Sequence, residues 1–264
     1  MKSGTAILNG VTIHYSVEGR GPDVLMVHGW SSSRRMWAHL SAALSPHFRC
    51  WSLDLPGFGD SDKPADDWYS IPNYQAVVAQ FMEAMGLWEV RLIGHSMGGL
   101  IALDFSATYP ERVSKLVVIN PVVTGRAYIA PLAGWKPGPA VLDNTQRLSR
   151  RLVRPVLKHQ WSKVLSPNVR YLQQRNDDFA RATVESLFGS GRATLDYDVL
   201  GKLPCIAAPT LIILGALDTT VPNSEGHLVA VEAPRARLVV LNVGHVVTDD
   251  RPAQTLRLIR EFFA

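Results

Sequence analysis

Several features that would indicate other classes of protein are scarce in this sequence of 264 residues. It has only two cysteines, Cys50 and Cys205, each in or beside an apolar segment, which predicts reduced structural thiols and a cytoplasmic location. No apolar run reaches the length of about 18 residues that a transmembrane helix needs, so no membrane span is expected. The first residues lack the apolar centre of a secretory signal, so export by that route is not expected.

Charged residues are also few, and they are unevenly distributed. They make up 19% of the chain, with a net charge of +4. Residues 122–200 hold twelve Lys or Arg and six Asp or Glu, whereas the remainder holds fifteen and seventeen. The basic character therefore belongs to one middle segment. Aromatic residues do not interleave with it as they do in nucleic-acid-binding modules, so no nucleic-acid partner is expected.

What the sequence does contain is a series of short apolar runs rich in Val, Ile and Leu. Such runs are typical of buried parallel strands. They cover residues 23–29, 48–57, 89–96, 114–122, 209–216 and 236–245. Helical patterns separate most of them, and an Asn9-Gly10 turn predicts a hairpin at the N-terminus. The alternation predicts an α/β fold built on a doubly wound, mostly parallel sheet.

The regular alternation stops near Val122 and resumes near Thr210. The segment between these points has helical patterns and no clear strand. We therefore predict a core domain formed by residues 1–121 and 201–264. Residues 122–200 are predicted to form an α-helical lid, inserted after the sixth strand, rather than an independent domain.

Ser96 lies in a pattern that is typical of a nucleophile. The segment Gly94-His95-Ser96-Met97-Gly98 follows a strand pattern and precedes a helical one, which is the context of the G-x-S-x-G nucleophile elbow. Its glycines are required because the sharp turn brings them against adjacent backbone. The following helix points N–H groups at the site, which favours developing negative charge. The alternative is a purely structural glycine-rich turn.

A serine hydroxyl needs a base to become nucleophilic at neutral pH, and His245 is the candidate. It follows the last strand pattern on a predicted loop, and the order serine, acid, histidine is expected for this architecture. Strand alternation predicts that the side chain of His95 points away from the site. His28 is expected to make structural hydrogen bonds. Surface or lid-edge positions are expected for His14, His39, His47, His159 and His227.

The imidazole of the base needs an acceptor that sets its tautomer, and Asp218 is the candidate. It ends a predicted strand and lies between Ser96 and His245 in the chain. Open parallel sheets form their sites at the carboxyl ends of the strands, where all three residues fall.

Five other residues compete for the role of the acid. Asp249 and Asp250 lie close to the predicted base but are expected to cap the final helix. Asp54 is expected to brace a glycine-rich turn, and Asp104 falls inside a helical pattern. Asn120 ends the strand after the elbow, but its side chain is an amide.

An oxyanion hole needs backbone N–H donors. We predict that Met97, which follows the nucleophile, supplies one and that Trp30 supplies the other. The ring of Trp30 is expected to shape the substrate pocket as well. The complete set of predicted pocket residues is His28, Trp30, Asn120, Trp135 and Trp161.

Six motifs together resemble the α/β-hydrolase superfamily over essentially the whole chain. They are HGW at 28–30, DLPGFGDSD at 54–62, GHSMGG at 94–99, PERV at 110–113, LGALDTTVP at 214–222 and GH at 244–245. The resemblance implies a triad of Ser96, His245 and Asp218, a lid over the site, and neither a cofactor nor a metal. HGW together with DLPGFG resembles the carboxylesterase branch, which implies a small-molecule ester as substrate.

Several activities of the superfamily remain open. Ser96 argues against dehalogenases and epoxide hydrolases, which have aspartate at the nucleophile position. Hydrolases of carbon–carbon bonds commonly carry Asn before the serine, where this chain has His95. Lactone and thioester hydrolysis use the same residues, as do cofactor-free haloperoxidases. A receptor with very slow turnover is also compatible with an intact triad.

The basic segment contains a possible interaction surface. Spacings of three and four residues would place its cations on one helical stripe. They are Arg147, Arg150, Arg151, Arg154 and Lys158. This stripe could receive an acidic partner, such as an acyl carrier protein, or it could be an ordinary solvated helix face.

Overall fold

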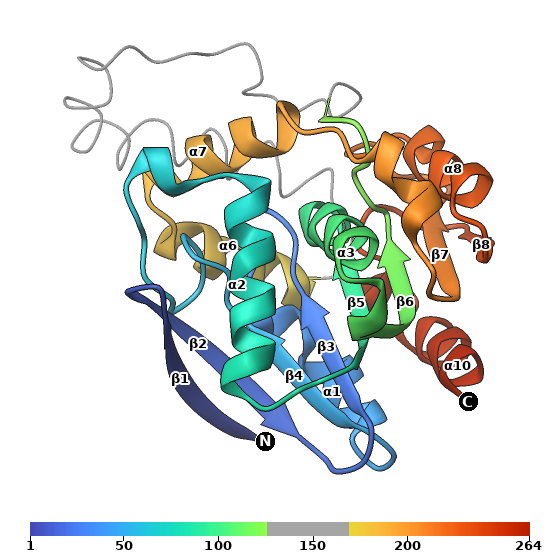
Figure 1. Cartoon of the computed structure of the whole chain (residues 1–264), viewed down its shortest axis with the longest axis horizontal. Coiled ribbons are helices and arrows are strands. Elements are labelled where there is room, and N and C mark those ends of the chain that lie inside the picture. The colour runs from blue at the N-terminus through green and yellow to red at the C-terminus, as the bar shows by residue number, and fades with distance from the viewer. Residues whose placement is uncertain (126–168) are drawn as a thin grey trace.

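The computed structural model describes residues 1–125 and 169–264, apart from the side chains of residues 66 and 169–172. Its centre is one eight-stranded sheet with the order β1-β2-β4-β3-β5-β6-β7-β8 (Figure 1). The strands are β1 (Lys2–Leu8), β2 (Val11–Glu18), β3 (Asp23–Val27), β4 (Arg49–Leu53), β5 (Val90–His95), β6 (Val113–Ile119), β7 (Thr210–Gly215) and β8 (Ala236–Leu241). All six predicted apolar runs contain a strand.

The sheet is parallel except at its N-terminal edge. There β1 pairs with β2, and β2 pairs with β4, in antiparallel register. The turn between β1 and β2 has φ values of 49° at Asn9 and 79° at Gly10, which are the left-handed conformations that a tight hairpin needs. The hairpin predicted at Asn9-Gly10 and the mostly parallel sheet are both confirmed.

Helices cover both faces of the sheet (Figure 1). In the described part of the chain they are α1 (Ala38–Leu44), α2 (Ile71–Ala84), α3 (Met97–Thr108), α6 (Val169–Arg181), α7 (Val184–Leu195), α8 (Asn223–Glu232), α9 (Val247–Asp250) and α10 (Pro252–Phe263). Side chains of α2, α3 and α8 bury one face of the sheet, and those of α1 and α10 bury the other. Burial from both sides explains why the parallel strands read as continuous apolar runs.

Two helices of the predicted lid, α6 and α7, lie between β6 and β7, which confirms a helical insertion after the sixth strand. Leu187 of α7 belongs to the same hydrophobic cluster as the sheet residues. Near the ends of the insertion, Thr124 and Asp198 form an antiparallel bridge. The buried Glu225 carboxylate accepts the N–H groups of Val123 and Thr124 at 2.7 and 2.6 Å. The exact boundaries at residues 122 and 200 remain predictions.

Both cysteines are free thiols, Cys50 buried and Cys205 exposed. Burial raises the pKa of Cys50 to about 12, so its thiol stays protonated. Among the helices of the described residues, none combines the length and the apolar character required to cross a membrane.

Candidate active site

Ser96 occupies the sharp turn between β5 and α3, as the elbow pattern predicts. Its backbone has φ 55° and ψ −120°, a conformation that a serine rarely adopts. The surrounding chain holds it there, because the N–H of Ser96 donates to the carbonyl of Ile119 at 3.0 Å and its own carbonyl accepts the N–H of Gly99 at 2.9 Å. Ser96 is 4% exposed, so the turn lies in a sheltered position.

The two glycines that flank this turn have no room for a side chain. A Cβ on Gly94 would overlap the carbonyl oxygen of Gly98 and lie 2.8 Å from the Cβ of Ala102. A Cβ on Gly98 would overlap the carbonyl oxygens of Val27 and His28. The requirement for small residues around the serine is therefore a matter of backbone-to-backbone packing.

Gly94→Ala is expected to destabilise the protein by about 1–3 kcal/mol, because neither the Gly98 carbonyl nor α3 can move away from the added methyl group. The matched control is Gly201→Ala, where nothing lies within 4 Å of the new Cβ. That change should stay within about 0.5 kcal/mol of wild type. Urea unfolding of both variants measures the difference, and equal stabilities would contradict the packing argument.

His245 and Asp218 form a directly bonded pair at the carboxyl edge of the sheet. Asp218 follows β7 and His245 follows β8, and these strands are neighbours. The distance between His245 Nδ1 and Asp218 Oδ2 is 2.6 Å. The other oxygen of Asp218 accepts the N–H groups of Thr220 and Val221 at 2.7 and 3.1 Å. The carboxylate is therefore fixed from both sides.

These contacts keep Asp218 ionised. Burial by itself would raise its pKa, but the charge and hydrogen bond of His245 and the N–H groups of Thr220 and Val221 outweigh burial and hold the pKa below its ordinary value. An ionised acceptor at Nδ1 places the proton on that nitrogen. In the neutral ring this arrangement leaves Nε2 of His245 as the nitrogen without a proton.

The side chain of His95 contradicts the prediction from strand alternation, because it points toward the pair rather than away from it. Its ring centroid lies 4.6 Å from that of His245, and its Nε2 lies 3.0 Å from the His245 carbonyl oxygen. Because His95 directly precedes Ser96 in the chain, this contact brings the elbow close to His245. Alternation describes only the two faces of a strand and cannot describe a side chain at its end, where the loop after β8 folds over it.

Asn120 and His28 each make two side-chain hydrogen bonds at the edge of the site. The amide of Asn120 donates to the His245 carbonyl and accepts the N–H of Gly215, both at 2.8 Å. His28 is 0% exposed. Its Nε2 accepts the N–H of Leu55 at 2.9 Å and its Nδ1 lies 2.8 Å from the Gly29 carbonyl. The expected structural hydrogen bonds of His28 are thus confirmed, and the placement of both side chains in a substrate pocket stays a prediction.

The loop after β3, which carries Trp30, is held by the inserted helices. Trp30 is 6% exposed, and its indole Nε1 donates to the carbonyl of Leu187 in α7 at 2.9 Å. From α6, Arg175 Nη1 donates to the carbonyls of Trp30 and Ser31 at 2.9 and 3.0 Å. Sequence reasoning did not identify Arg175, because it is one of twelve cations in the middle segment and no motif marks it.

Two of the rival acids have structural roles, as expected. Asp54 accepts the N–H groups of Arg34 and Asp60 at 2.6 and 2.9 Å and packs against Gly59, so it braces the glycine turn. Asp104 of α3 accepts from Tyr197 and Lys202 at 2.7 and 2.6 Å, which ties that helix to the segment after α7.

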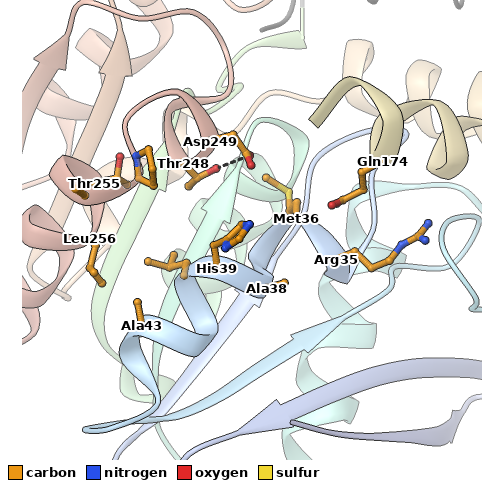
Figure 2. A pocket seen from close by; sticks show the side chains of 13 residues that line it. Arg35, Met36, Ala38, His39, Ala43, Gln174, Thr248, Asp249, Thr255 and Leu256 are labelled. Atoms are coloured by element: carbon orange, nitrogen blue, oxygen red, sulfur yellow. Dashed lines mark hydrogen bonds between the residues drawn. The ribbon is translucent and has the colours of Figure 1, made fainter. Parts of the chain in front are cut away.

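Asp249 lies in a groove of about 690 Å³ between α1, α6 and the C-terminal helices, and Figure 2 shows it next to Thr248 with His39 reaching in from α1. Ser96 and His245 do not line this groove. The expected capping of the final helix is not observed. Asp249 belongs to α9, while α10 begins after Arg251 without a side-chain cap. Pro252, the first residue of α10, has no N–H, so one of the N–H groups that would lack a partner in the first turn is absent.

Asp249→Asn is expected to stabilise the protein above pH 6. Burial raises the pKa of Asp249 to about 6, from a usual value of 3.8. A carboxyl whose pKa is higher in the folded state costs stability as the pH rises from about 4 to about 6, because the folded state must release a proton that it binds more tightly. The variant should gain up to about 3 kcal/mol at neutral pH and nothing below about pH 4. Urea unfolding between these pH values is the test, and a pH-independent difference would contradict it.

The described residues contain no group of three His, Cys, Asp or Glu side chains that could hold a metal ion. Two predicted pocket residues, Trp135 and Trp161, lie outside the described residues. The same holds for the whole basic stripe, which comprises Arg147, Arg150, Arg151, Arg154 and Lys158. Their roles in a pocket and in an interaction surface therefore stay predictions.

A strained strand–serine–helix turn, and a His–Asp pair at the carboxyl edge of the same mostly parallel sheet, are features typical of hydrolases that carry a nucleophile elbow. The sequence profile of the alpha/beta hydrolase fold family matches residues 22–252. The chain belongs to this family, and that membership supports a hydrolase activity.

Relatives in the family carry several names. A pimeloyl-[acyl-carrier protein] methyl ester esterase of Aeromonas hydrophila is 28% identical over 252 residues, covering 92% of this chain and 96% of that protein. A 2-hydroxy-6-oxo-6-phenylhexa-2,4-dienoate hydrolase of Comamonas testosteroni is 29% identical, covering 97% and 92%. The crystal structure of the enol-lactonase from Burkholderia xenovorans LB400 matches with a TM-score of 0.83 at 24% identity, covering 98% and 99%. At that identity, the structural likeness shows the fold alone.

Proposed function

We propose that the protein is a serine hydrolase that cleaves carboxylic esters through an acyl-enzyme, with Ser96, His245 and Asp218 as its triad. One observation carries the proposal: the 2.6 Å contact of His245 Nδ1 with Asp218, beside a strained elbow serine. The contact supports a base whose Nε2 is not engaged by Asp218, and the elbow conformation supports a serine held at the turn between strand and helix, as nucleophiles of this architecture are.

In the proposed reaction, Ser96 Oγ attacks the ester carbonyl while His245 Nε2 takes its proton. The resulting imidazolium remains paired with Asp218 and then protonates the leaving alcohol as the tetrahedral intermediate collapses. Water enters, His245 accepts one of its protons, and the hydroxide attacks the acyl-enzyme carbonyl. Collapse of the second intermediate releases the acid and returns the proton to Ser96.

The negative oxygen of each intermediate is assigned to the backbone N–H groups of Met97 and Trp30. Met97 is the first residue of α3, so its N–H is not used within the helix and lies at the positive end of the helix dipole. Trp30 lies on the loop that Arg175 and Leu187 hold in place. No cofactor or metal takes part in this scheme.

A second candidate is hydrolysis of a carbon–carbon bond in a vinylogous diketone. It is supported by the relative named 2-hydroxy-6-oxo-6-phenylhexa-2,4-dienoate hydrolase, which is as similar to this chain as the esterase is. The residue before the nucleophile, His95, favours the ester. Lactone and thioester hydrolysis, and a slow-turnover receptor, remain further alternatives because the same residues serve them.

Initial rates on p-nitrophenyl esters from acetate to palmitate test the proposal, with Ser96→Ala protein as the blank. Saturable turnover that peaks at one chain length and vanishes in the blank is the expected result. A dienoic diketone and a lactone are assayed in parallel. Faster turnover of either one reassigns the substrate class, and no turnover of any substrate by folded protein favours the receptor.

A small-molecule ester as substrate and a cytoplasmic location are consistent with the family and with the free thiols. An acidic partner at the basic stripe rests on the charge pattern of residues 147–158 alone.

A further inference from the structure

The backbone carbonyl of His245 is held by two side chains that the proposed reaction does not use. His95 Nε2 lies 3.0 Å and Asn120 Nδ2 lies 2.8 Å from this oxygen. A carbonyl oxygen has two lone pairs, so both N–H groups can donate to it at once. The two donors stand at the ends of β5 and β6, which are paired strands. The carbonyl of His245 is thus bonded to side chains at the ends of these two strands, and its ring is bonded to Asp218.

The protonation and burial of His95 are consistent with a role as a hydrogen-bond donor to the His245 carbonyl. Because its partner is a carbonyl, Nε2 must carry the proton, and Nδ1 is left as a buried acceptor with no partner among the described residues. Burial, followed by the nearby His245, lowers the pKa of His95 to about 3, so the ring stays neutral. An unpaired buried acceptor is destabilising, which means that stability alone does not explain a histidine at this position.

Asn120 uses both ends of its amide, and they reach different parts of the site. Its Nδ2 donates to the His245 carbonyl, while its Oδ1 accepts the N–H of Gly215, the last residue of β7. That strand leads directly to Asp218. The backbone of Asn120 has φ 44°, a left-handed conformation that asparagine tolerates better than most residues. In an ionised aspartate at this position, a carboxylate oxygen would replace the donating NH₂ group. It would face the His245 carbonyl oxygen, and neither oxygen could donate a hydrogen bond to the other.

We propose that His95 and Asn120 are positioning residues that together fix the His245 backbone, and with it the direction of the imidazole toward Ser96. The inference rests on the proposed function, in which His245 is the base. After β8, the backbone of its loop is joined to the segment after β7 at Val243, whose carbonyl accepts the N–H of Leu217 at 2.9 Å. The two side chains extend this hold to the His245 carbonyl. Losing a donor allows the loop to shift, and a displacement of about 1 Å in a reacting group can cost about 100-fold in rate.

The test compares His95→Leu, His95→Gln and Asn120→Asp by steady-state kinetics on the best p-nitrophenyl ester. Leucine removes the donor, whereas the amide of glutamine can place an N–H near the position of Nε2. Asn120→Asp replaces the donating NH₂ with an oxygen. We expect kcat to fall about 10- to 100-fold in the Leu and Asp variants with little change in KM, and the Gln variant to recover most of the loss.

Two controls separate positioning from a general loss of structure. His227→Leu changes an exposed histidine of α8 and should leave kcat unchanged. The low-field proton resonance of the His245–Asp218 hydrogen bond, measured by NMR, should shift or broaden in the His95→Leu and Asn120→Asp proteins and stay sharp in His95→Gln and His227→Leu. A purely structural role would lower thermal stability without this pattern.

The inference is overturned if folded His95→Leu or Asn120→Asp protein keeps kcat within about twofold of wild type and shows an unchanged resonance. A change in kcat of about twofold is smaller than a loss of positioning would cause. Should the leucine variant not fold, Asn120→Asp decides alone. Failure of the proposed function is a different result, since wild type would then turn over no ester. In that case the resonance, which needs no substrate, still reports whether the two side chains hold His245.

Discussion

Ser96→Ala is expected to lower kcat on the best ester by about 10⁴- to 10⁶-fold, with KM little changed. Without the hydroxyl no acyl-enzyme can form, so only the residual rate from substrate binding and the oxyanion hole remains. Steady-state rates are compared with the uncatalysed background. Mass spectrometry after treatment with a fluorophosphonate should show one covalent adduct on wild type, at Ser96, and none on the variant.

Ser106→Ala is the matched control for that experiment. Ser106 is also buried and lies in α3, but its hydroxyl donates to the carbonyl of Ala102 in the same helix at 2.7 Å. Its removal should leave kcat near that of wild type. If Ser96→Ala protein kept a rate within about tenfold of wild type, the acyl-enzyme mechanism would be wrong, because triads lose far more than this.

Asp218→Asn should lower kcat by about 10⁴-fold while leaving the fold intact. The amide can still occupy the space, but its NH₂ group faces His245 Nδ1 and favours the tautomer whose Nε2 carries a proton and cannot act as the base. The 2.6 Å contact between Nδ1 and Oδ2 makes this dependence direct. The pKa of Asp218 is held below its ordinary value in the folded protein. The wild-type interaction therefore contributes its full stabilisation when the pH is above that ordinary pKa. This stabilisation is lost as the pH falls through the lowered pKa.

Asp249→Asn is the matched control, because Asp249 lies only four positions after His245 and competed with Asp218 on sequence grounds. It lies in the groove that Ser96 and His245 do not line. Its replacement should change stability with pH, as described above, and leave kcat near that of wild type. A large loss of kcat in Asp249→Asn together with little loss in Asp218→Asn would reverse the assignment of the acid.

Much of the fold follows from local patterns in the chain. The runs of Val, Ile and Leu mark β3 to β7 because strands covered on both faces need no polar side. The edge strand β8 is also apolar in sequence, but it is only partly buried. Gly94 and Gly98 mark the elbow because backbone packing there excludes any Cβ. Asp218 and His245 could be selected as partners because each follows a strand, and the ends of parallel strands meet at one edge of the sheet.

The contacts around His245 could not be read in this way. His95 and Asn120 reach its carbonyl across separations of 150 and 125 residues. Strand alternation predicted the wrong direction for the side chain of His95. It assigns a side chain to one face of a strand, but the contact is made at the strand's end by a loop from elsewhere. Asn120 was rejected as an acid for being an amide, and that amide is what lets it donate to one group while accepting from another.

The sequence by itself therefore determined the family, the sheet, the elbow and the identity of the His–Asp pair, because each depends on short-range periodicity or on a single obligatory residue type. The tertiary structure decided which side chains hold the base and the Trp30 loop, and where Asp249 lies. Those contacts depend on the order of strands in the sheet and on the packing of α6 and α7 against it, and residues far apart in the chain carry no local signal of such neighbours.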